Sequence, residues 1–310
     1  MVSGQSMFSE LRRIPHYLRK APKKLKLAYR SLRSPYFRSV EPGHFYSPFP
    51  DMEEMERRTD YIYPPTPSDL AGLNLSKSAH EELLTKFESY YSQLPFERTE
   101  NPNCRYYRPN ESFPFQDAFA LYAMIRHLKP KRFIEVGCGN SSSVILDTCE
   151  AMKINTQLTF IEPYPEPLFQ KLRLGDRDRF KLIVQCTQDV PLETFTQLEA
   201  NDVLFIDTSH VSKIGSDVNH IFFHILPHLA KGVQVHFHDI WYPFEYPKHW
   251  LHGGSFWNEA YLLRAFLMFN PAFEITMFNS YVFKCLPERV NASFPLFLEG
   301  PGASLWLRRT

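Results

Sequence analysis

The chain has 310 residues, of which 44% are hydrophobic and 22% charged, the composition of an ordinary globular protein with room for one large core. Its five cysteines include no C-x-x-C pair and are odd in number, which argues against a disulfide scaffold or a zinc cluster and favours a reducing cytoplasm. No apolar stretch approaches the roughly 20 residues that span a bilayer, and the first residues lack the apolar core of a secretion signal. We therefore expect a cytoplasmic protein with no transmembrane segment.

Residues 1–40 form a basic N-terminal arm. They hold ten Lys or Arg residues against Glu10 alone, a net charge of +9, so the other 270 residues sum to −8. Such an arm is suited to anionic lipid, to nucleic acid or to the acidic surface of its own chain. Three prolines interrupt it, which disfavours one long helix on a membrane surface. We interpret it as a partly ordered docking arm.

Residues 41–115 form a second region, rich in Pro, Tyr and Phe, which we interpret as a helical and aromatic cap. Its clearest helix is predicted over 76–92, because Ser76 or Ser78 can cap the start and two glutamates follow in the first turns.

Residues 116–310 alternate between apolar strand patterns and amphipathic helix patterns. Helices are predicted at 116–128, 141–152, 166–173, 191–199, 214–229 and 256–269, and strands at 132–136, 157–161, 180–185, 202–206, 232–238, 272–278 and 304–309. This alternation predicts an α/β fold, a Rossmann-like, seven-stranded and mainly parallel sheet with helices on both faces. Ligands of such sheets bind at the carboxyl ends of the strands, so the residues that follow each strand are the candidates for a site.

The first strand is followed by the loop "EVGCGNSS", which contains Glu135, Gly137 and Gly139. A dinucleotide fingerprint would require a third glycine where Ser142 stands, so the match to that motif is incomplete. The second strand ends at Glu162, whose carboxylate is suited to accept hydrogen bonds from two ribose hydroxyls. Nicotinamide enzymes also place an acid there, so this residue alone does not identify the ligand.

The next two strands also end in polar residues. Gln188 and Asp189 follow the third strand and are suited to read an adenine amino group, while Asp207 and His210 follow the fourth in "FIDTSH".

The succession of "EVGCG", "FIEPYP", "QDV", "FIDTSH" and "VHFHDI" resembles the class I S-adenosyl-L-methionine-dependent methyltransferases, over about residues 113–310. Within that class the chain is similar to bacterial sugar and natural-product O-methyltransferases. The resemblance implies that the first loop lies near the methionine part of the donor, that two serines cap the helix and bind the donor carboxylate, and that acids and an amide hold the nucleoside. The residues implied are Glu135, Gly137, Gly139, Ser141, Ser142, Glu162, Gln188, Asp189 and Asp207.

Methyl transfer to an alcohol requires that the hydroxyl loses its proton, either to a base or with the help of a Lewis acid. His210 is our first candidate for the catalytic base and His238 the second, because both come at the carboxyl end of a strand; His236 is more simply explained as a core residue. Relatives that bind a divalent metal carry an acid after the fourth strand and an acid pair after the fifth. Here the positions are Asp207 and the pair His238 and Asp239, a departure that weakens a magnesium interpretation but leaves a softer metal open.

The fifth strand is followed by "WYPFEYPKHWLHGGSFWNEAYLL", an insertion rich in proline and aromatic residues. We expect an ordered lid whose tryptophans and tyrosines line an acceptor pocket, with Gly253 and Gly254 as a hinge. Glu259, at the start of the following helix, is explained by the helix dipole alone.

The sequence therefore predicts O-methylation of a small-molecule hydroxyl, in a natural product or a sugar. An oxidoreductase or hydroxylase on the same fold, and a non-catalytic nucleotide-binding protein, remain as alternatives, because a fold does not determine a function. A nucleic-acid acceptor is disfavoured, since residues 116–310 show no interleaving of aromatic and basic residues. The identity of the acceptor and the formation of a homo-oligomer stay open.

Overall fold

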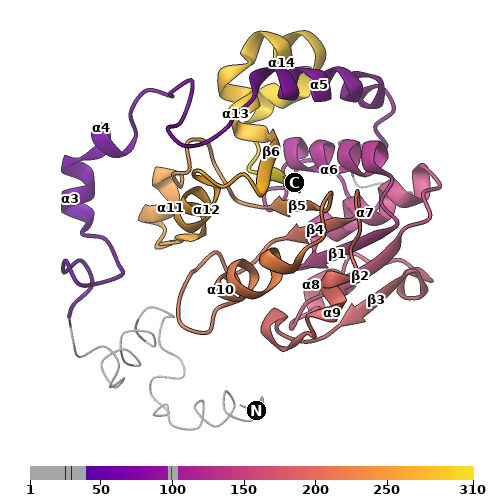
Figure 1. Cartoon of the computed structure of the whole chain (residues 1–310), viewed down its shortest axis with the longest axis horizontal. Coiled ribbons are helices and arrows are strands. Elements are labelled where there is room, and N and C mark those ends of the chain that lie inside the picture. Colours follow the sequence, from indigo (N-terminus) through magenta and orange to yellow (C-terminus); the bar gives the residue numbers. More distant parts are fainter. Residues whose placement is uncertain (1–24, 26–28, 30–39, 97–98, 100–103) are drawn as a thin grey trace. The chain divides into compact units, whose positions relative to one another are not determined.

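The structure is a computed structural model that describes residues 25, 29, 40–96, 99 and 104–310 (Figure 1). It divides into two compact units, Met1–Ile62 and Tyr63–Thr310. Almost all of the basic N-terminal arm lies outside the described residues. The three-part organisation expected from the sequence, with boundaries after residues 40 and 115, therefore stays a prediction.

The described part of the first unit contains two short helices, α3 (Met52–Arg57) and α4 (Thr59–Ile62). Helix α3 begins after Asp51, whose carboxylate accepts hydrogen bonds from two backbone N–H groups of the first turn.

The second unit is built on a seven-stranded sheet with the order β3-β2-β1-β4-β5-β7-β6 (Figure 1). Strands β1 to β5 are parallel, and β7 is antiparallel to both of its neighbours. This confirms the predicted Rossmann-like fold. The strands are β1 (Arg132–Val136), β2 (Gln157–Ile161), β3 (Phe180–Ile183), β4 (Val203–Ile206), β5 (Gln234–Phe237), β6 (Phe273–Phe278) and β7 (Leu305–Arg309).

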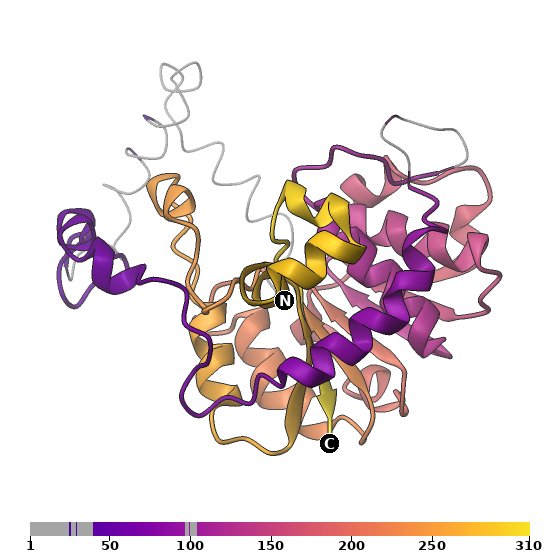
Figure 2. The same ribbon diagram turned by 90° about the horizontal axis from the view of Figure 1, so that it is seen from above.

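Helices cover both faces of this sheet, which is why β4 and β5 are buried throughout. The sequence of β4 is accordingly a continuous apolar run, whereas β5 includes the buried polar residues Gln234 and His236. Figures 1 and 2 show α5, α6 and α7 on one side of the sheet and α10 on the other. Helix α5 begins after Ser76, whose hydroxyl accepts from the N–H of Ala79, as the sequence predicted. The helices are α5 (Lys77–Tyr91), α6 (Phe115–Leu128), α7 (Asn140–Ala151), α8 (Glu166–Phe169), α9 (Glu193–Thr196), α10 (Asp217–His220), α11 (Lys248–His252), α12 (Glu259–Leu267), α13 (Asn279–Cys285) and α14 (Pro287–Ser293).

The helix predicted at 214–229 is irregular in the structure. One α-helical turn, α10, is followed by a π-helix at Ile221–Ile225 and a 3-10 turn at Leu226–His228. Pro227 lies in the last turn and has no N–H to donate to the carbonyl four residues back, so the α-helical ladder cannot continue through it. Nowhere in the described part of the chain is a helix long and apolar enough to cross a membrane.

Candidate active site

The turn after β1 requires glycine at its first position. Gly137 has φ +82°, and a Cβ atom on it would lie 1.8 Å from the carbonyl oxygen of Asp207. The chain can therefore bring the ends of β1 and β4 together only with glycine at this place. Gly139 differs, because its φ of 174° is extended backbone and a Cβ atom there would meet nothing within 4 Å.

Beneath this turn, Glu135 holds the start of α7. Its side chain is fully buried, and its two carboxylate oxygens accept hydrogen bonds from the hydroxyls of Ser141 and Ser142, each at 2.5 Å. The Ser142 hydroxyl also accepts from the N–H of Gly139 at 3.0 Å. Burial raises the pKa of Glu135 to about 8, against the opposing effect of the two hydroxyls. In this structure both serines are thus engaged within the turn.

Glu162 follows β2 and lies at the edge of an open pocket. Its carboxylate accepts from the N–H groups of Cys138 at 3.2 Å and Tyr164 at 2.8 Å, which fixes its direction. The pocket has a volume of about 390 Å³ and lies at the carboxyl ends of the strands. Four of the predicted site residues line it, Gly137, Glu162, Gln188 and Asp207. Asp189 follows β3 as predicted but is exposed and does not line the pocket.

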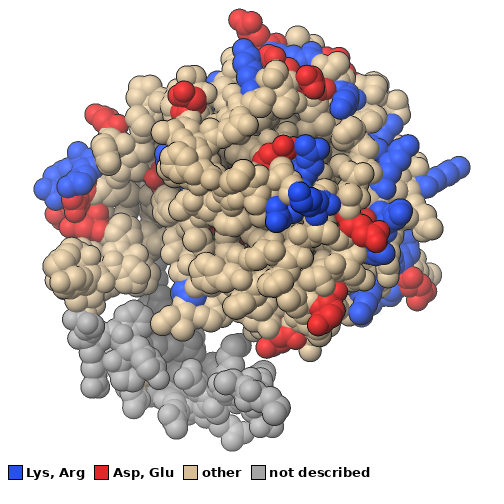
Figure 3. Space-filling model, viewed as in Figure 1, with Lys and Arg blue, Asp and Glu red and all other residues tan. Residues whose placement is uncertain are grey.

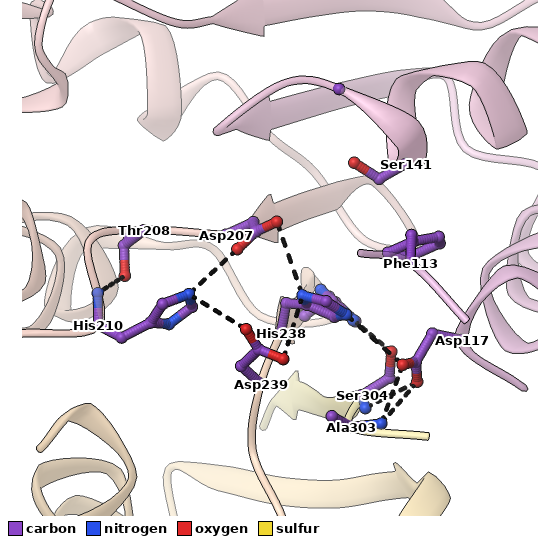
Figure 4. Close-up of polar contacts among 12 residues, drawn as sticks. Phe113, Asp117, Ser141, Asp207, Thr208, His210, His238, Asp239, Ala303 and Ser304 are labelled. Carbon is purple, nitrogen blue, oxygen red and sulfur yellow. Dashed lines mark hydrogen bonds and ion pairs between the residues drawn. The ribbon is translucent and has the colours of Figure 1, made fainter. Parts of the chain in front are cut away.

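The residues predicted for catalysis and for a metal meet in one cluster, in which carboxylates and imidazoles alternate (Figure 4). His210 Nε2 lies 3.3 Å from Asp207 Oδ1 and 3.5 Å from Asp239 Oδ2. His238 Nδ1 lies 3.6 Å from Asp207 Oδ2 and 3.7 Å from Asp239 Oδ1. These four side chains, which we call the acid–imidazole ring, close on themselves at the ends of β4 and β5. One ligand atom each from Asp207, His238 and Asp239 lies within 4.8 Å of the others, a spacing that fits one metal ion.

A buried carboxylate backs each imidazole from outside the ring. Glu259 Oε2 lies 2.8 Å from His210 Nδ1, and Asp117 Oδ2 lies 3.5 Å from His238 Nε2. Glu259 is the first residue of α12 and Asp117 lies in the first turn of α6. The sequence indicates only a helix-dipole role for Glu259 and none for Asp117. Neither residue directly follows a strand, so the rule that located the other site residues could not find them.

The charges of this cluster are strongly coupled. Burial disfavours a charged histidine, but the hydrogen bonds with Asp207 and Glu259 outweigh it and raise the pKa of His210 to about 10. The pKa of His238 is also raised despite its burial, by the charges of Asp239 and Asp207. Conversely, the imidazoles hold the pKa of Asp207 well below its usual range even though burial opposes this. A raised pKa favours the protonated form of each ring, and a protonated imidazole cannot accept a further proton.

His236 is separate from this chemistry. Its ring stacks on Phe205 with centroids 3.8 Å apart, and its Nε2 lies 2.8 Å from the hydroxyl of Ser304. Burial lowers its pKa well below the ordinary value, so it is a neutral core residue, as the sequence suggested.

Two members of the ring have left-handed backbone conformations. His210 and Asp239 both have φ +58°, which costs a residue with a side chain about 1–2 kcal/mol. The carbonyl of His210 accepts from the N–H groups of Asn258 at 3.0 Å and Glu259 at 3.2 Å, which helps to hold this conformation. Strained backbone conformations persist only where surrounding contacts enforce them, and they are concentrated at functional sites.

Residues 241–258, which we call the aromatic arm, leave the sheet after Asp239 and return immediately before Glu259. Figure 2 shows this segment, drawn in orange with α11 at its tip, projecting from the body of the unit. The ring of Trp257 packs on that of His210, with centroids 4.4 Å apart, and also contacts Trp250 at 5.1 Å. A continuous set of aromatic rings thus connects His210 to the aromatic arm.

The chain is similar to known proteins in sequence and in fold. Residues 134–240 match the family model of a methyltransferase domain. An uncharacterised protein of Archaeoglobus fulgidus is 35% identical over 164 residues, which are 52% of this chain and 74% of that protein. Among solved structures, an SAH-bound methyltransferase of Podospora anserina aligns over 88% of this chain and 99% of its own, with 16% identity and a TM-score of 0.41. The O-methyltransferase TomG of Streptomyces achromogenes, involved in tomaymycin synthesis and solved with SAM, aligns over 74% and 90%, with 15% identity and a TM-score of 0.40.

Proposed function

Because the chain belongs to the class I methyltransferases, we propose that it transfers a methyl group from S-adenosyl-L-methionine to a hydroxyl group of a small molecule. One observation carries the proposal. Glu162, suited to a ribose, and Asp207, a member of the acid–imidazole ring, line the same pocket at the carboxyl ends of the strands. A donor whose ribose is bound by Glu162 would extend its sulfonium group toward Asp207.

The donor site is supported by spare hydrogen-bonding capacity. Each oxygen of Glu162 accepts one backbone N–H, and a carboxylate has about four acceptor positions, so two ribose hydroxyls can still be bound. Gln188 lines the pocket and would contact the adenine side, whereas the contact expected of Asp189, which is exposed and does not line the pocket, stays a prediction. Ser141 and Ser142 support the turn through Glu135, and their expected contact with the donor carboxylate stays a prediction.

The balance of charge favours a cationic ligand. The ring and its two outer acids comprise four carboxylates and two imidazoles, and most of these side chains are buried. With all four acids ionised, negative charge is in excess even when both histidines are protonated, and burial raises the pKa values of Asp239 and Glu259 accordingly. A sulfonium donor and its amino group bring positive charge to this place, which lowers the cost of burying the acids.

The reaction is a displacement at carbon, in which the acceptor oxygen gains the methyl group, the sulfonium becomes a thioether and the hydroxyl proton leaves. The protein has to align the two reactants and to remove that proton. His210 or His238 can take it only after losing its own proton, because both have raised pKa values. We therefore propose that turnover depends on a neutral ring histidine, with His210 as the first candidate.

A divalent cation fits the same ring. Asp207, His238 and Asp239 would hold it, and it would supply Lewis-acid activation of the acceptor hydroxyl. Two carboxylates with one imidazole suit manganese, iron or zinc better than magnesium, which prefers oxygen ligands throughout.

The aromatic arm suits an acceptor with an apolar ring or face, because Trp257 and Trp250 extend outward from His210. A nucleic acid is a poorer fit. On the face drawn in Figure 3, the described Lys and Arg residues are interspersed with Asp and Glu, and they form no continuous basic surface there.

Calorimetric titration with S-adenosyl-L-methionine and with a nicotinamide cofactor tests this proposal. We expect binding of the first alone, and methylated product by mass spectrometry with candidate alcohols. His210→Ala should retain donor affinity but lose about 10²–10⁴ in turnover. His228→Ala, an exposed histidine outside the site, is the matched control and should behave as wild type. Binding of the nicotinamide cofactor alone would favour an oxidoreductase, and binding of neither would favour a non-catalytic protein.

A further inference from the structure

Glu259 is a buried acid whose two oxygens are both directed at the loop after β4. Its side chain is 1% exposed. One oxygen lies 2.8 Å from Nδ1 of His210, and the other accepts from the hydroxyl of Thr208 at 3.1 Å. A residue that only complemented the helix dipole would not need such burial, since exposed acids at a helix start perform that role equally well.

The same helix start is bonded to this loop through the backbone. The His210 carbonyl accepts from the N–H groups of both Asn258 and Glu259. The Asn258 side chain accepts from the N–H of Ser212 at 2.6 Å and donates to the carbonyl of Ser212 at 3.3 Å. With Trp257 packed on the imidazole, three successive residues contact the loop that carries His210: Trp257 and Asn258 at the end of the aromatic arm, and Glu259 directly after it. The end of the arm is therefore bonded to the loop that holds the imidazole.

The chemistry of the contact defines how the ring must lie. An ionised carboxylate only accepts hydrogen bonds, so a partner nitrogen 2.8 Å away must carry the proton. Nδ1 is thereby assigned as the donor to Glu259, and Nε2 is left facing Asp207 and Asp239. A ring turned over about its long axis would lose this bond and leave a buried acid without its partner.

We propose that Glu259 is a positioning residue for His210, which fixes the imidazole with Nε2 toward the reacting centre and so couples the aromatic arm to that histidine. The expected effect on turnover rests on the proposed function. The orientation of the His210 imidazole does not, because it follows from the contacts of that imidazole with Glu259, Asp207 and Asp239.

Glu259→Gln and Glu259→Ala provide the test. Glutamine is nearly the size of glutamate, but its amide can offer Nδ1 either an oxygen or an NH₂ group, so the orientation of the ring is no longer fixed. We expect both variants to lose at least about tenfold in kcat, as is usual when a partner that orients a functional group is removed. The affinity for the donor and its KM should stay within about twofold, a split typical of a residue that acts on the chemical step. Asp202→Asn is the control, because Asp202 is an equally buried acid that accepts from the N–H groups of Lys131 and Arg132, outside the site.

A second measurement is independent of turnover. In wild type the Nδ1 proton of His210 should give a far-downfield, slowly exchanging NMR signal, assigned by its loss in His210→Ala. The signal should persist in Asp202→Asn and move or vanish in Glu259→Gln, since a bond to a carboxylate is about twice as strong as one to a neutral amide. An unchanged signal in the glutamine variant, wild-type turnover of that variant, or an equal loss in the Asp202 control would each overturn the proposal. If wild type binds no donor, the proposed function fails while this signal still decides the orientation of the ring.

Discussion

Replacing Gly137 by alanine should disturb the site by a purely steric route. The new Cβ atom would lie 1.8 Å from the carbonyl oxygen of Asp207 and 2.9 Å from its carbonyl carbon, and no side-chain rotation can relieve contacts with backbone. The φ of +82° costs an alanine about 1–2 kcal/mol. Moving the end of β4 adds about 1–3 kcal/mol, the usual cost of overpacking. We therefore expect Gly137→Ala to lower the free energy of unfolding by about 2–5 kcal/mol.

Gly139→Ala is the matched control, because it adds the same methyl group two residues away. Its backbone is extended, and a Cβ atom there meets nothing within 4 Å, so the cost in stability should be below about 1 kcal/mol. Urea unfolding followed by circular dichroism measures both variants, and donor titration measures the effect on the site. Equal stabilities of the two variants would show that the ends of β1 and β4 are not packed as the structure has them.

Four further predictions concern the donor site and the acid–imidazole ring. Glu162→Ala should weaken donor binding by roughly 1.5–3 kcal/mol, the range for hydrogen bonds to a charged group, and unchanged affinity in a folded variant would remove the ribose assignment. Excess EDTA should abolish turnover and a divalent ion should restore it if Asp207 and Asp239 bind a required metal; full activity with the chelator would leave the histidines alone. If a neutral His210 is required, turnover should rise with pH toward its pKa of about 10, whereas a plateau from about pH 6.5 upward would indicate a histidine with an ordinary pKa. Because this pKa is raised on folding, the ion pairs of His210 should stabilise the fold fully below about pH 6.5 and progressively less as the pH rises through 10, which unfolding curves across that range would test.

The sheet could be predicted because each strand carries its own local signal. The runs at 132–136 and 157–161 coincide with β1 and β2, and the other five strands differ by one or two residues at their ends. Buried parallel strands leave continuous apolar runs, and the polar residues that follow them identify the site edge. The sequence predicts no element between β6 and β7, where the structure has α13 and α14. These short helices depend on packing against the body more than on a strong pattern of their own.

The acid–imidazole ring could be predicted from the sequence, but the two acids outside it, Asp117 and Glu259, could not. Asp207, His210, His238 and Asp239 follow strands, so sheet topology brings them together. Asp117 lies within a helix that is buried on nearly all sides, where most of the surrounding residues are apolar and give no indication of its partner. Its hydrogen bonds to the backbone before β7 can be recognised only in the folded structure.

The contacts of Asp117 connect the completion of the site to the completion of the sheet. Its carboxylate accepts from the backbone N–H groups of Ala303 and Ser304, the latter 187 residues further along the chain, as Figure 4 shows. Contacts of such sequence separation form late in folding, because a long loop must close before they can be made. On a ribosome, the same acid would face His238 without its partners until the last strand had emerged. The nascent chain should therefore gain the complete charge balance of the site only after β7 has emerged, and a truncation before β7 would remove that charge balance together with the strand that joins β5 to β6.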